Sequence, residues 1–369
     1  MYIIKKIKNK KQTTTLSMTI DALRFPLALM IILLHNNPLG IQVALHNNNM
    51  DLYYLYPVYY TIQHLFTNDI TRIAVPLFFF ISGYLFFLKL SESPPHHHYS
   101  RKMKGLMKRI VVPYFLWNVI YILFNFMIQT FFASFIQGDQ KLYADYSWSD
   151  WLHFIWYPAG GHLWFLRDLF VVSVCSLPLF FVLRNKILGL CTVLLLGVVW
   201  FLDAPKVFGL ITVESFFFWS VGTYVCLSKI DFSDSQKLVL PVVLIYTYVL
   251  VVEMLLWHYD ISSFIYFERL GICIGLLLAL AITAKFLTKH NLQTNPLLPK
   301  SSFFIYLSHG IVLLLFCRAF TMFVPTSELS LILEYFIVPP VVAALLFWIY
   351  RLMSKYTPSF LKLLNGGRV

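Results

Sequence analysis

The sequence predicts an all-α, polytopic membrane protein with about ten transmembrane helices and both termini in the cytosol. Hydrophobic residues make up 59% of the 369-residue chain and charged residues 12%, whereas soluble proteins carry about 25% charged residues. The main solvent is therefore lipid, in which backbone polar groups need partners within the protein, and only helices or closed barrels provide them. Long unbroken apolar runs such as 238–257 favour helices, because barrel strands alternate in hydrophobicity.

Apolar windows of transmembrane length set the predicted spans, since a helix crosses the hydrocarbon core with about 20 residues. The windows are 18–37, 72–90, 108–132, 162–183, 187–202, 207–227, 238–257, 265–287, 301–322 and 330–352. The intervening segments 38–71 and 133–161 are predicted to be long outside loops. Residues 1–17 and 354–369 are predicted to be cytosolic tails, so 18–353 forms one ten-helix domain.

The positive charge follows the positive-inside rule. The net charge is +12, and most of the 29 Lys and Arg residues lie in the tails and in the alternate loops assigned to the cytosol, such as 101–109. This distribution predicts the orientation of the chain. We expect a multi-pass protein of the inner (cytoplasmic) membrane, in contact with membrane lipid. It also argues against the interpretation that the positive charge binds nucleic acid.

Several familiar site motifs are absent from the sequence. It contains no GxGxxG or Walker loop, no HExxH and no GxSxG elbow. Three adjacent histidines, His96, His97 and His98, cannot easily face one metal ion, and all five cysteines lie in apolar runs without CxxC spacing. We therefore expect no metal site and no bound cofactor, and any chemistry should rest on His and Arg.

The first predicted span contains two polar residues that point to function. Arg24 and His35 are eleven residues apart, which at 100° per residue places them on nearly the same helix face, about 16 Å apart along the axis. A charge at bilayer depth is costly and marks a functional candidate. The structural alternative is that Arg24 extends to lipid phosphates and that His35 lies at the interface; spacing alone leaves both open.

Other polar groups fall within or beside the predicted spans. Arg167 and Asp168 are adjacent and should point about 100° apart, so we expect at least one to meet another helix. His309 lies mid-span, where a hydrogen bond between helices is the simplest explanation. Glu253 and Arg318 lie near helix ends and are expected to face water. The remaining members of this group are Arg72, His162, Glu214 and Arg269.

Five segments, in order along the chain, carry a resemblance to a known family. They are Thr19–Arg24 with His35, Arg72–Tyr84, Lys108–Tyr114, Gly161–Arg167 and Ser302–His309. The first is similar to the Arg-x10-His motif of the acyltransferase-3 family, bacterial membrane O-acyltransferases that modify surface glycans, and the others resemble further motifs of that family. One departure is Leu106, which stands where many members carry the first arginine of an Arg-x-x-Arg pair.

The resemblance implies transfer of an acyl group, usually acetyl, from cytosolic acyl-CoA to a hydroxyl of a lipid-linked or surface glycan. It implies His35 as catalytic base or transient acyl carrier, with Arg24, Lys108 and Arg109 binding the donor. A cation suits the donor's phosphates, and a neutral imidazole can accept a hydroxyl proton. The other candidates for substrate binding or for stabilising the oxyanion are Arg72, Ser82, His162, Trp164, Arg167 and His309.

Two readings without acyl transfer stay open. In the first, the chain is a transporter or flippase of a glycan lipid, with His and Arg lining a path. In the second, it is a membrane subunit that recruits a soluble enzyme through the basic segment 101–109. Consumption of acyl-CoA separates the enzyme from both.

Overall fold

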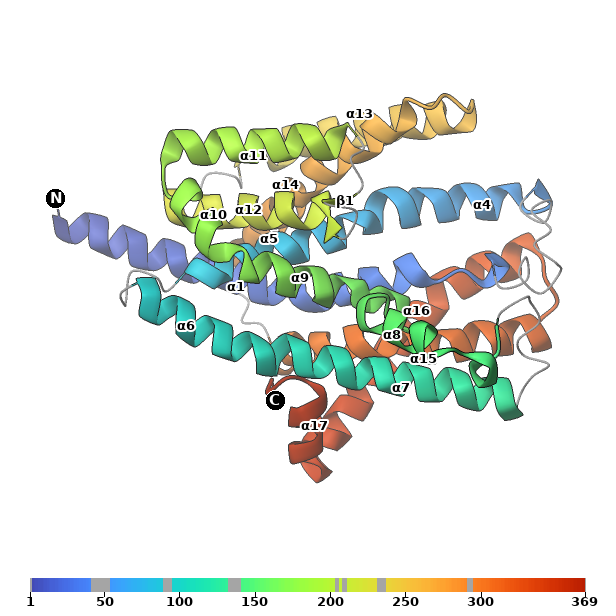
Figure 1. Ribbon diagram of the computed structural model, residues 1–369. Helices are drawn as coiled ribbons and strands as arrows, with labels where there is room; N and C mark the ends of the chain where they lie inside the picture. Colours follow the sequence, from blue (N-terminus) through green and yellow to red (C-terminus); the bar gives the residue numbers. More distant parts are fainter. Residues whose placement is uncertain are drawn as a thin grey trace. The chain divides into compact units, whose positions relative to one another are not determined.

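The computed structural model describes residues 2–40, 54–88, 95–131, 141–202, 206–207, 211–230, 237–290 and 295–368. Of residues 2–15, 95–98 and 206–207 only the backbone is described, so the expectation that His96, His97 and His98 bind no metal lies outside the described side chains. The described chain is mostly helical, as predicted (Figure 1). Its helices are α1 (Tyr2–His35), α4 (Pro57–His64), α5 (Ala74–Phe87), α6 (Pro95–Leu106), α7 (Val112–Phe131), α8 (Trp148–Trp156), α9 (Trp164–Val174), α10 (Ser176–Leu183), α11 (Lys186–Phe201), α12 (Val213–Ser228), α13 (Val239–His258), α14 (Phe264–His290), α15 (Leu297–Phe323), α16 (Glu328–Tyr356) and α17 (Pro358–Leu364).

Short elements of other kinds join these helices. Two π-helical segments, η1 (Leu65–Ile70) and η4 (Met107–Val111), run into longer helices, and η2 (Thr71–Ile73), η6 (Tyr143–Asp145) and η7 (Gly161–Leu163) are 3-10 turns. The strands β1 (Lys206–Val207) and β2 (Ile211–Thr212) pair antiparallel.

Seven helices of the described chain are long and apolar enough to cross a membrane. An eighth candidate, Gly161–Leu183, is bent by 60° where α9 meets α10. Helices α11 and α12 have 16 residues each, slightly fewer than the ~17–25 of a typical span. A multi-pass membrane protein is thus confirmed, whereas ten spans and cytosolic termini stay predictions.

The second spanning helix begins well before its predicted start at residue 72. It runs from Pro57 to Phe87 without a break, so much of the predicted outside loop 38–71 is helical. Its first turn is capped by the Glu328 carboxylate, which accepts hydrogen bonds from the backbone N–H groups of Val58 (3.1 Å) and Tyr59 (2.7 Å). Its polar residues Asp69 and Thr71 lowered the hydropathy of this stretch, yet both are buried in protein.

The predicted span 207–227 also starts at a different residue. Residues 206–212 contribute the two short strands, and α12 begins at Val213. Thr212 caps this helix, because its side chain accepts a hydrogen bond from Ser215 N at 3.3 Å. A threonine at this position satisfies one of the unpaired amides of the first turn.

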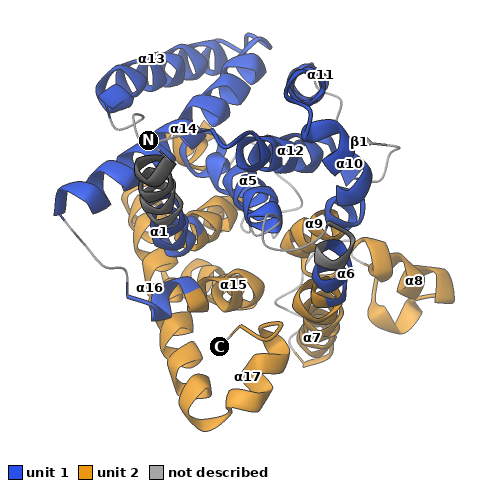
Figure 2. Cartoon of the chain, turned by 90° about the vertical axis from the view of Figure 1, so that its left-hand side faces the viewer, with its two compact units in different colours: residues 1–27, 68–104, 171–299 blue, residues 28–67, 105–170, 300–369 orange. Residues whose placement is uncertain are grey.

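The chain divides into two compact units, and several helices pass from one into the other (Figure 2). Unit 1 comprises residues 1–27, 68–104 and 171–299. Unit 2 comprises residues 28–67, 105–170 and 300–369.

In unit 1, α5 packs tightly against α12. A Cβ atom at Gly83 would overlap the carbonyl oxygen of Trp219, and one at Gly222 would overlap that of Phe80. The Thr223 hydroxyl donates to the Gly83 carbonyl at 3.3 Å. Small residues at such a crossing let two membrane helices approach closely, so that van der Waals contact holds them together.

In unit 2, α16 packs against α4 around a cluster of Leu39, Tyr59, Leu331 and Tyr335, all fully buried. Figure 2 shows α15, α16 and α17 in this unit. Helix α17 lies against α7, where the Trp117 indole N–H donates to the Leu364 carbonyl at 3.1 Å.

Candidate functional site

A cavity of about 550 Å³ lies within unit 2, a size typical of small-molecule sites. Its walls come from the end of α1, from α7, from the turn before α9 and from α15. The lining residues are His35, Asn37, Gly40, Tyr121, Phe124, Asn125, Ala159, Gly160, Gly161, His162, Trp164, His309, Gly310, Leu313, Leu314, Cys317 and Arg318.

Three histidines from three separate parts of the chain meet in this cavity. The rings of His35 and His309 are stacked, with centroids 5.4 Å apart and planes 26° apart. The ring of His162 lies 4.5 Å from that of His309 and 6.1 Å from that of His35. His162 and His309 are buried, whereas His35 is exposed. The structure thus brings the predicted catalytic residue together with two of the predicted substrate or oxyanion candidates.

The hydrogen bonds of His309 fix its proton. Its Nδ1 lies 2.6 Å from the Tyr306 carbonyl; because a carbonyl only accepts, Nδ1 carries the proton and Nε2 has a lone pair. That Nε2 is buried and has no hydrogen-bond partner among the described residues. The expected hydrogen bond between helices is wrong, since Tyr306 lies one turn earlier in α15 itself. Such a buried lone pair needs a donor, which a bound molecule could supply.

Side chains of α7 and α15 hold His162 in place. Its Nε2 donates to the Leu307 carbonyl at 3.3 Å and lies 3.4 Å from the Tyr121 hydroxyl. The Tyr121 hydroxyl also donates to Leu307 O at 3.1 Å. The Tyr306 hydroxyl donates to the His162 carbonyl at 2.6 Å. Both ring and backbone of His162 are therefore fixed, and its Nδ1 is left as the unprotonated nitrogen.

Glycines make room for Tyr121 inside this site. A Cβ atom at Gly160 would lie 2.7 Å from the Tyr121 ring, and one at Gly310 would lie 2.9 Å from its hydroxyl oxygen and 3.3 Å from His162 Nδ1. Gly161, in contrast, has open space around its missing Cβ. Packing therefore requires a glycine at position 160 but not at position 161.

A buried polar network fixes the backbone next to His35. The Asn36 amide donates to Glu334 Oε2 at 3.1 Å and to the Tyr335 carbonyl at 3.3 Å. The Cys317 thiol lies 3.1 Å from Asn36 Oδ1 and 3.4 Å from Glu334 Oε1. These contacts tie the end of α1 to α15 and α16, so they limit where the imidazole can move.

Arg167 does not extend into the cavity lining. It pairs with Asp168, with Nη2–Oδ1 2.7 Å and Nε–Oδ1 2.8 Å, and its Nη1 donates to the Trp156 carbonyl at 2.8 Å. The expectation that at least one of them meets another helix is confirmed, because Trp156 belongs to α8. The two side chains nevertheless do not point apart, because the long Arg side chain folds back to its neighbour. Trp164, three residues before Arg167, does line the cavity.

The predicted donor-binding pair Lys108 and Arg109 is exposed in η4, directly before α7. The Arg109 carbonyl accepts a hydrogen bond from the Arg368 guanidinium at 3.0 Å. Gly366, with φ +60°, lies so close to the Arg109 backbone that its Cβ would be 2.7 Å from Arg109 O. The last turn of the chain thus adds a third cation beside this pair.

Three further candidates belong to unit 1. Arg24 is half-buried and pairs with Asp21 at 3.2 Å within α1. Arg72 pairs with Glu214 at 3.3 Å and lies 4.0 Å from Glu268. Ser82, in α5, is half-buried. The structure thus places both arginines in ion pairs, which lower the cost of a charge at bilayer depth.

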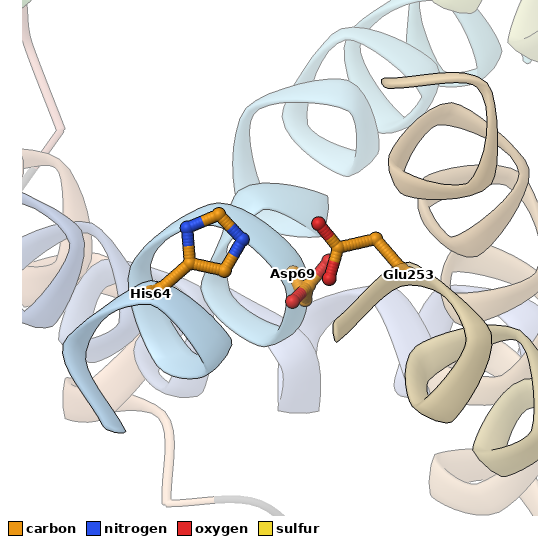
Figure 3. A group of neighbouring side chains, drawn as sticks. All are labelled: His64, Asp69 and Glu253. Atoms are coloured by element: carbon orange, nitrogen blue, oxygen red, sulfur yellow. The ribbon is translucent and has the colours of Figure 1, made fainter. Parts of the chain in front are cut away.

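Unit 1 also holds two buried carboxyl groups side by side, Asp69 in η1 and Glu253 in α13 (Figure 3). Their oxygens lie within 4.8 Å of each other, and the exposed fractions are 3% and 0%. The expectation that Glu253 faces water is therefore wrong. The third labelled residue, His64, lies five positions before Asp69 along the same helical stretch. Two buried carboxylates at this distance repel each other unless a proton or cation lies between them.

Sequence reasoning did not find Tyr121, Gly310 or the amides Asn37 and Asn125. An aromatic or glycine in an apolar helix carries no signal of its own, since most serve packing. Arg318 did carry a signal as a charge near a span, but it was expected to face water. It is half-buried and lines the cavity.

One comparison with known proteins bears on this site. A family model described as an acyltransferase domain, that of the acyltransferase-3 family, matches residues 19–351. The match spans His35, His162 and His309 and both units. No curated protein and no solved structure matches the chain.

Proposed function

Because the chain belongs to the acyltransferase-3 family, we propose that it transfers an acyl group, acetyl in the first instance, from cytosolic acyl-CoA to a hydroxyl of a lipid-linked or surface glycan. The proposed setting is the bacterial inner membrane, where the donor and the growing glycan lie on opposite sides. The observation that carries this proposal is the meeting of His35, His162 and His309 in one cavity.

In the proposed reaction, His35 acts as general base. Its imidazole takes the proton of the acceptor hydroxyl as the oxygen attacks the thioester carbonyl carbon. The carbon–sulfur bond then breaks, and the imidazolium returns the proton to the departing thiolate, which yields the glycan ester and free CoA. A second route passes through a transient acyl-imidazole on His35, which the hydroxyl attacks afterwards.

The neighbouring histidines support this role of His35. Backbone carbonyls hold the proton of His309 on Nδ1 and that of His162 on Nε2, so each ring presents a lone pair on its other nitrogen. The His309 ring, stacked on His35, restricts the orientation of the base. Fixed tautomer and ring orientation are what general-base catalysis needs from its surroundings.

A donor for the thioester oxyanion should come from the cavity wall. Of the six candidates, His162, Trp164 and His309 line the cavity. Arg167 is engaged by Asp168 and the Trp156 carbonyl, and Arg72 by Glu214. The N–H of His162 is given to the Leu307 carbonyl, so we assign the oxyanion role to the indole N–H of Trp164, and a structural role to the two arginines.

The donor's phosphates are proposed to bind at Lys108, Arg109 and Arg24. Arg109 precedes Tyr121, which contacts His162, by twelve residues, or about 18 Å along the helix. Arg24 precedes His35 by about 16 Å on the same measure. Along each of these two helical stretches a cation thus precedes a residue of the histidine site by a similar rise, which suits a long donor whose thioester is remote from its phosphates.

The test measures free CoA released by the purified protein in lipid nanodiscs, supplied with acetyl-CoA and glycan extracted from cells that lack the gene. We expect CoA release that requires glycan, and loss of that release in His35→Ala. His290→Ala, which removes an exposed histidine at the end of α14, is the matched control and should be fully active. Mass spectrometry of the glycan should show a gain of one acyl mass.

The transporter reading predicts a different result. A flippase of glycan lipid would move the lipid between leaflets and release no CoA, whatever the acceptor. Glycan-dependent movement without CoA release would therefore replace the acyltransferase proposal.

A further inference from the structure

The charge distribution around the histidine cavity says something about the acceptor. Among the seventeen lining residues that the structure describes, Arg318 is the only one with a full charge at neutral pH, and none of these seventeen is Asp or Glu. The other polar side chains are two amides, a phenol, an indole, a thiol and three imidazoles. Arg318 lies in the last turns of the candidate span Leu297–Phe323. A site for a neutral sugar alone has no need for an arginine there, because a charge within a span is expensive unless it serves function.

Arg318 belongs to the same face of α15 as the histidine end of the cavity. The lining residues of this helix come in pairs four residues apart: His309 with Gly310, Leu313 with Leu314, and Cys317 with Arg318. Residues four apart form a continuous ridge on a helix. The cavity therefore follows α15 for two and a half turns, with Arg318 at one end and His309 at the other.

The distance along this face suits a substrate of sugar size. Nine residues separate Arg318 from His309, or about 13.5 Å of rise. Helical side chains lean towards the N-terminus of their helix, so we expect the long Arg318 side chain to reach back along the ridge towards the histidines. Its guanidinium has no ion-pair or hydrogen-bond partner among the described residues. The residue is half-buried.

We propose that the acceptor carries an anionic group, a carboxylate or a phosphate, close to the hydroxyl that is acylated, and that Arg318 binds this group. This inference rests on the proposed acyl transfer and names its substrate class: an acidic rather than a neutral glycan. The planar guanidinium can form two parallel hydrogen bonds with either anion. Binding of the anion at Arg318 positions the neighbouring sugar hydroxyls at His35.

Paired probes that differ only in the anion test this proposal without turnover. Purified protein in nanodiscs is titrated calorimetrically with p-nitrophenyl β-glucuronide and with p-nitrophenyl β-glucoside, and in a second arm with glucose 6-phosphate and with glucose. We expect the anionic member of at least one pair to bind roughly tenfold tighter or more. The arm in which this occurs tells whether the acceptor's anion is a carboxylate or a phosphate.

Substitutions assign the effect to Arg318. Arg318→Gln should abolish the preference for the anionic probe and leave binding of the neutral probe unchanged, and Arg318→Lys should restore part of the preference. Arg351→Gln removes an exposed arginine of α16 in the same unit and should change neither. Equal binding within both pairs, no binding of any anionic probe, or a preference that survives in Arg318→Gln would each overturn the proposal.

These outcomes are distinct from failure of the proposed function. Binding of the probes requires neither acetyl-CoA nor His35, so it can be measured in His35→Ala as well. If glycan-dependent CoA release occurs but Arg318→Gln does not raise the KM for the glycan acceptor, the proposed acyltransferase activity stands and the proposal of an acidic acceptor is refuted. If no CoA is released under any condition while the anionic preference is found, the cavity binds an acidic sugar for another purpose.

Discussion

The imidazole rings of His35 and His309 are stacked with centroids 5.4 Å apart and planes 26° apart, although one ends the first helix and the other lies in the middle of α15. The two residues are far apart in the sequence, so local sequence alone does not bring their rings together. Their contact follows from packing within unit 2, where Asn36 is tied to Glu334 and His309 to the carbonyl of Tyr306. The two residues should therefore act together in catalysis.

We expect His35→Ala to lower the rate of acyl transfer by about 10²–10⁴-fold, the usual contribution of a general base, and to leave binding of acetyl-CoA intact. His309→Ala should give a smaller loss, because it removes a positioning contact. Residues that act as a unit are not additive, so the double variant should be no slower than His35→Ala. A double variant whose loss is the product of the two single losses would show that they act independently.

Gly310→Ala tests the space that Tyr121 occupies. The new methyl group would lie 2.9 Å from the Tyr121 hydroxyl oxygen and 3.1 Å from His162 Cε1, so Tyr121 and His162 must shift. A displacement of this kind in a site can cost about 10²-fold in rate. Gly161→Ala is the control, since its Cβ would meet nothing within 4 Å. Equal kcat values for the two variants would show that the position of Tyr121 and His162 is unimportant.

The fold class and the membership of His35 in the site were predictable because each has a signal in the local sequence. Apolar length marks spans, and the resemblance of Arg24 and His35 to a family motif marks His35, whereas the spacing of the two residues alone left an interfacial histidine open. The cavity was not predictable, because Tyr121, Gly310 and Asn37 become site residues only through packing of distant helices. Hydropathy also misplaced the start of the second span: residues 57–71 look like a loop, yet protein rather than lipid surrounds Asp69 and Thr71.

The contacts of charged residues were predictable only in part: Arg167 does meet another helix, at the Trp156 carbonyl of α8, but it also pairs with its neighbour. Arg167 and Asp168 point apart at Cβ, but the four-atom stem of arginine lets the guanidinium return to the neighbouring carboxylate. Glu253 was expected to face water because it lies near a helix end. It is buried beside Asp69 instead, a relationship between α13 and η1 that no single segment encodes.

The carboxyl pair of unit 1 gives a prediction on stability. Because Asp69 and Glu253 lie side by side and buried, Glu253→Gln should relieve their repulsion and let an amide donate to Asp69. We expect its melting temperature in detergent to equal or exceed that of the wild type. Glu253→Ala, which leaves Asp69 without this neighbour, should lose about 1–3 kcal/mol. Equal losses in both variants would contradict this prediction, because an amide at position 253 would then stabilise Asp69 no better than a methyl group does.

Four reporter positions test the predicted orientation of the chain in the membrane. Fusions after Pro158 and Thr326 should report the outside, and fusions after Ser100 and Asn291 the cytosol, because basic residues gather on the cytosolic side. With seven or eight long spans in the described chain, the two 16-residue helices α11 and α12 decide whether the number reaches ten. A reversal at any of the four sites would contradict the charge argument.

The donor end provides the last prediction. Arg24→Ala should raise the KM for acetyl-CoA more than the KM for the glycan, since Arg24 lies about 16 Å along α1 from His35 and its charge suits a phosphate. Arg24→Lys should rescue only part of the effect, because a point charge replaces a planar fork. Asp21→Asn is an informative companion: it removes the partner that now holds Arg24 at 3.2 Å and should leave donor binding equal or stronger.

The affinity is measured with CoA on the purified protein in nanodiscs at two salt concentrations, because a phosphate contact weakens with salt. If Arg24→Ala binds CoA as tightly as the wild type at both, Arg24 is not part of the donor site, and Lys108 with Arg109 becomes the remaining candidate for it.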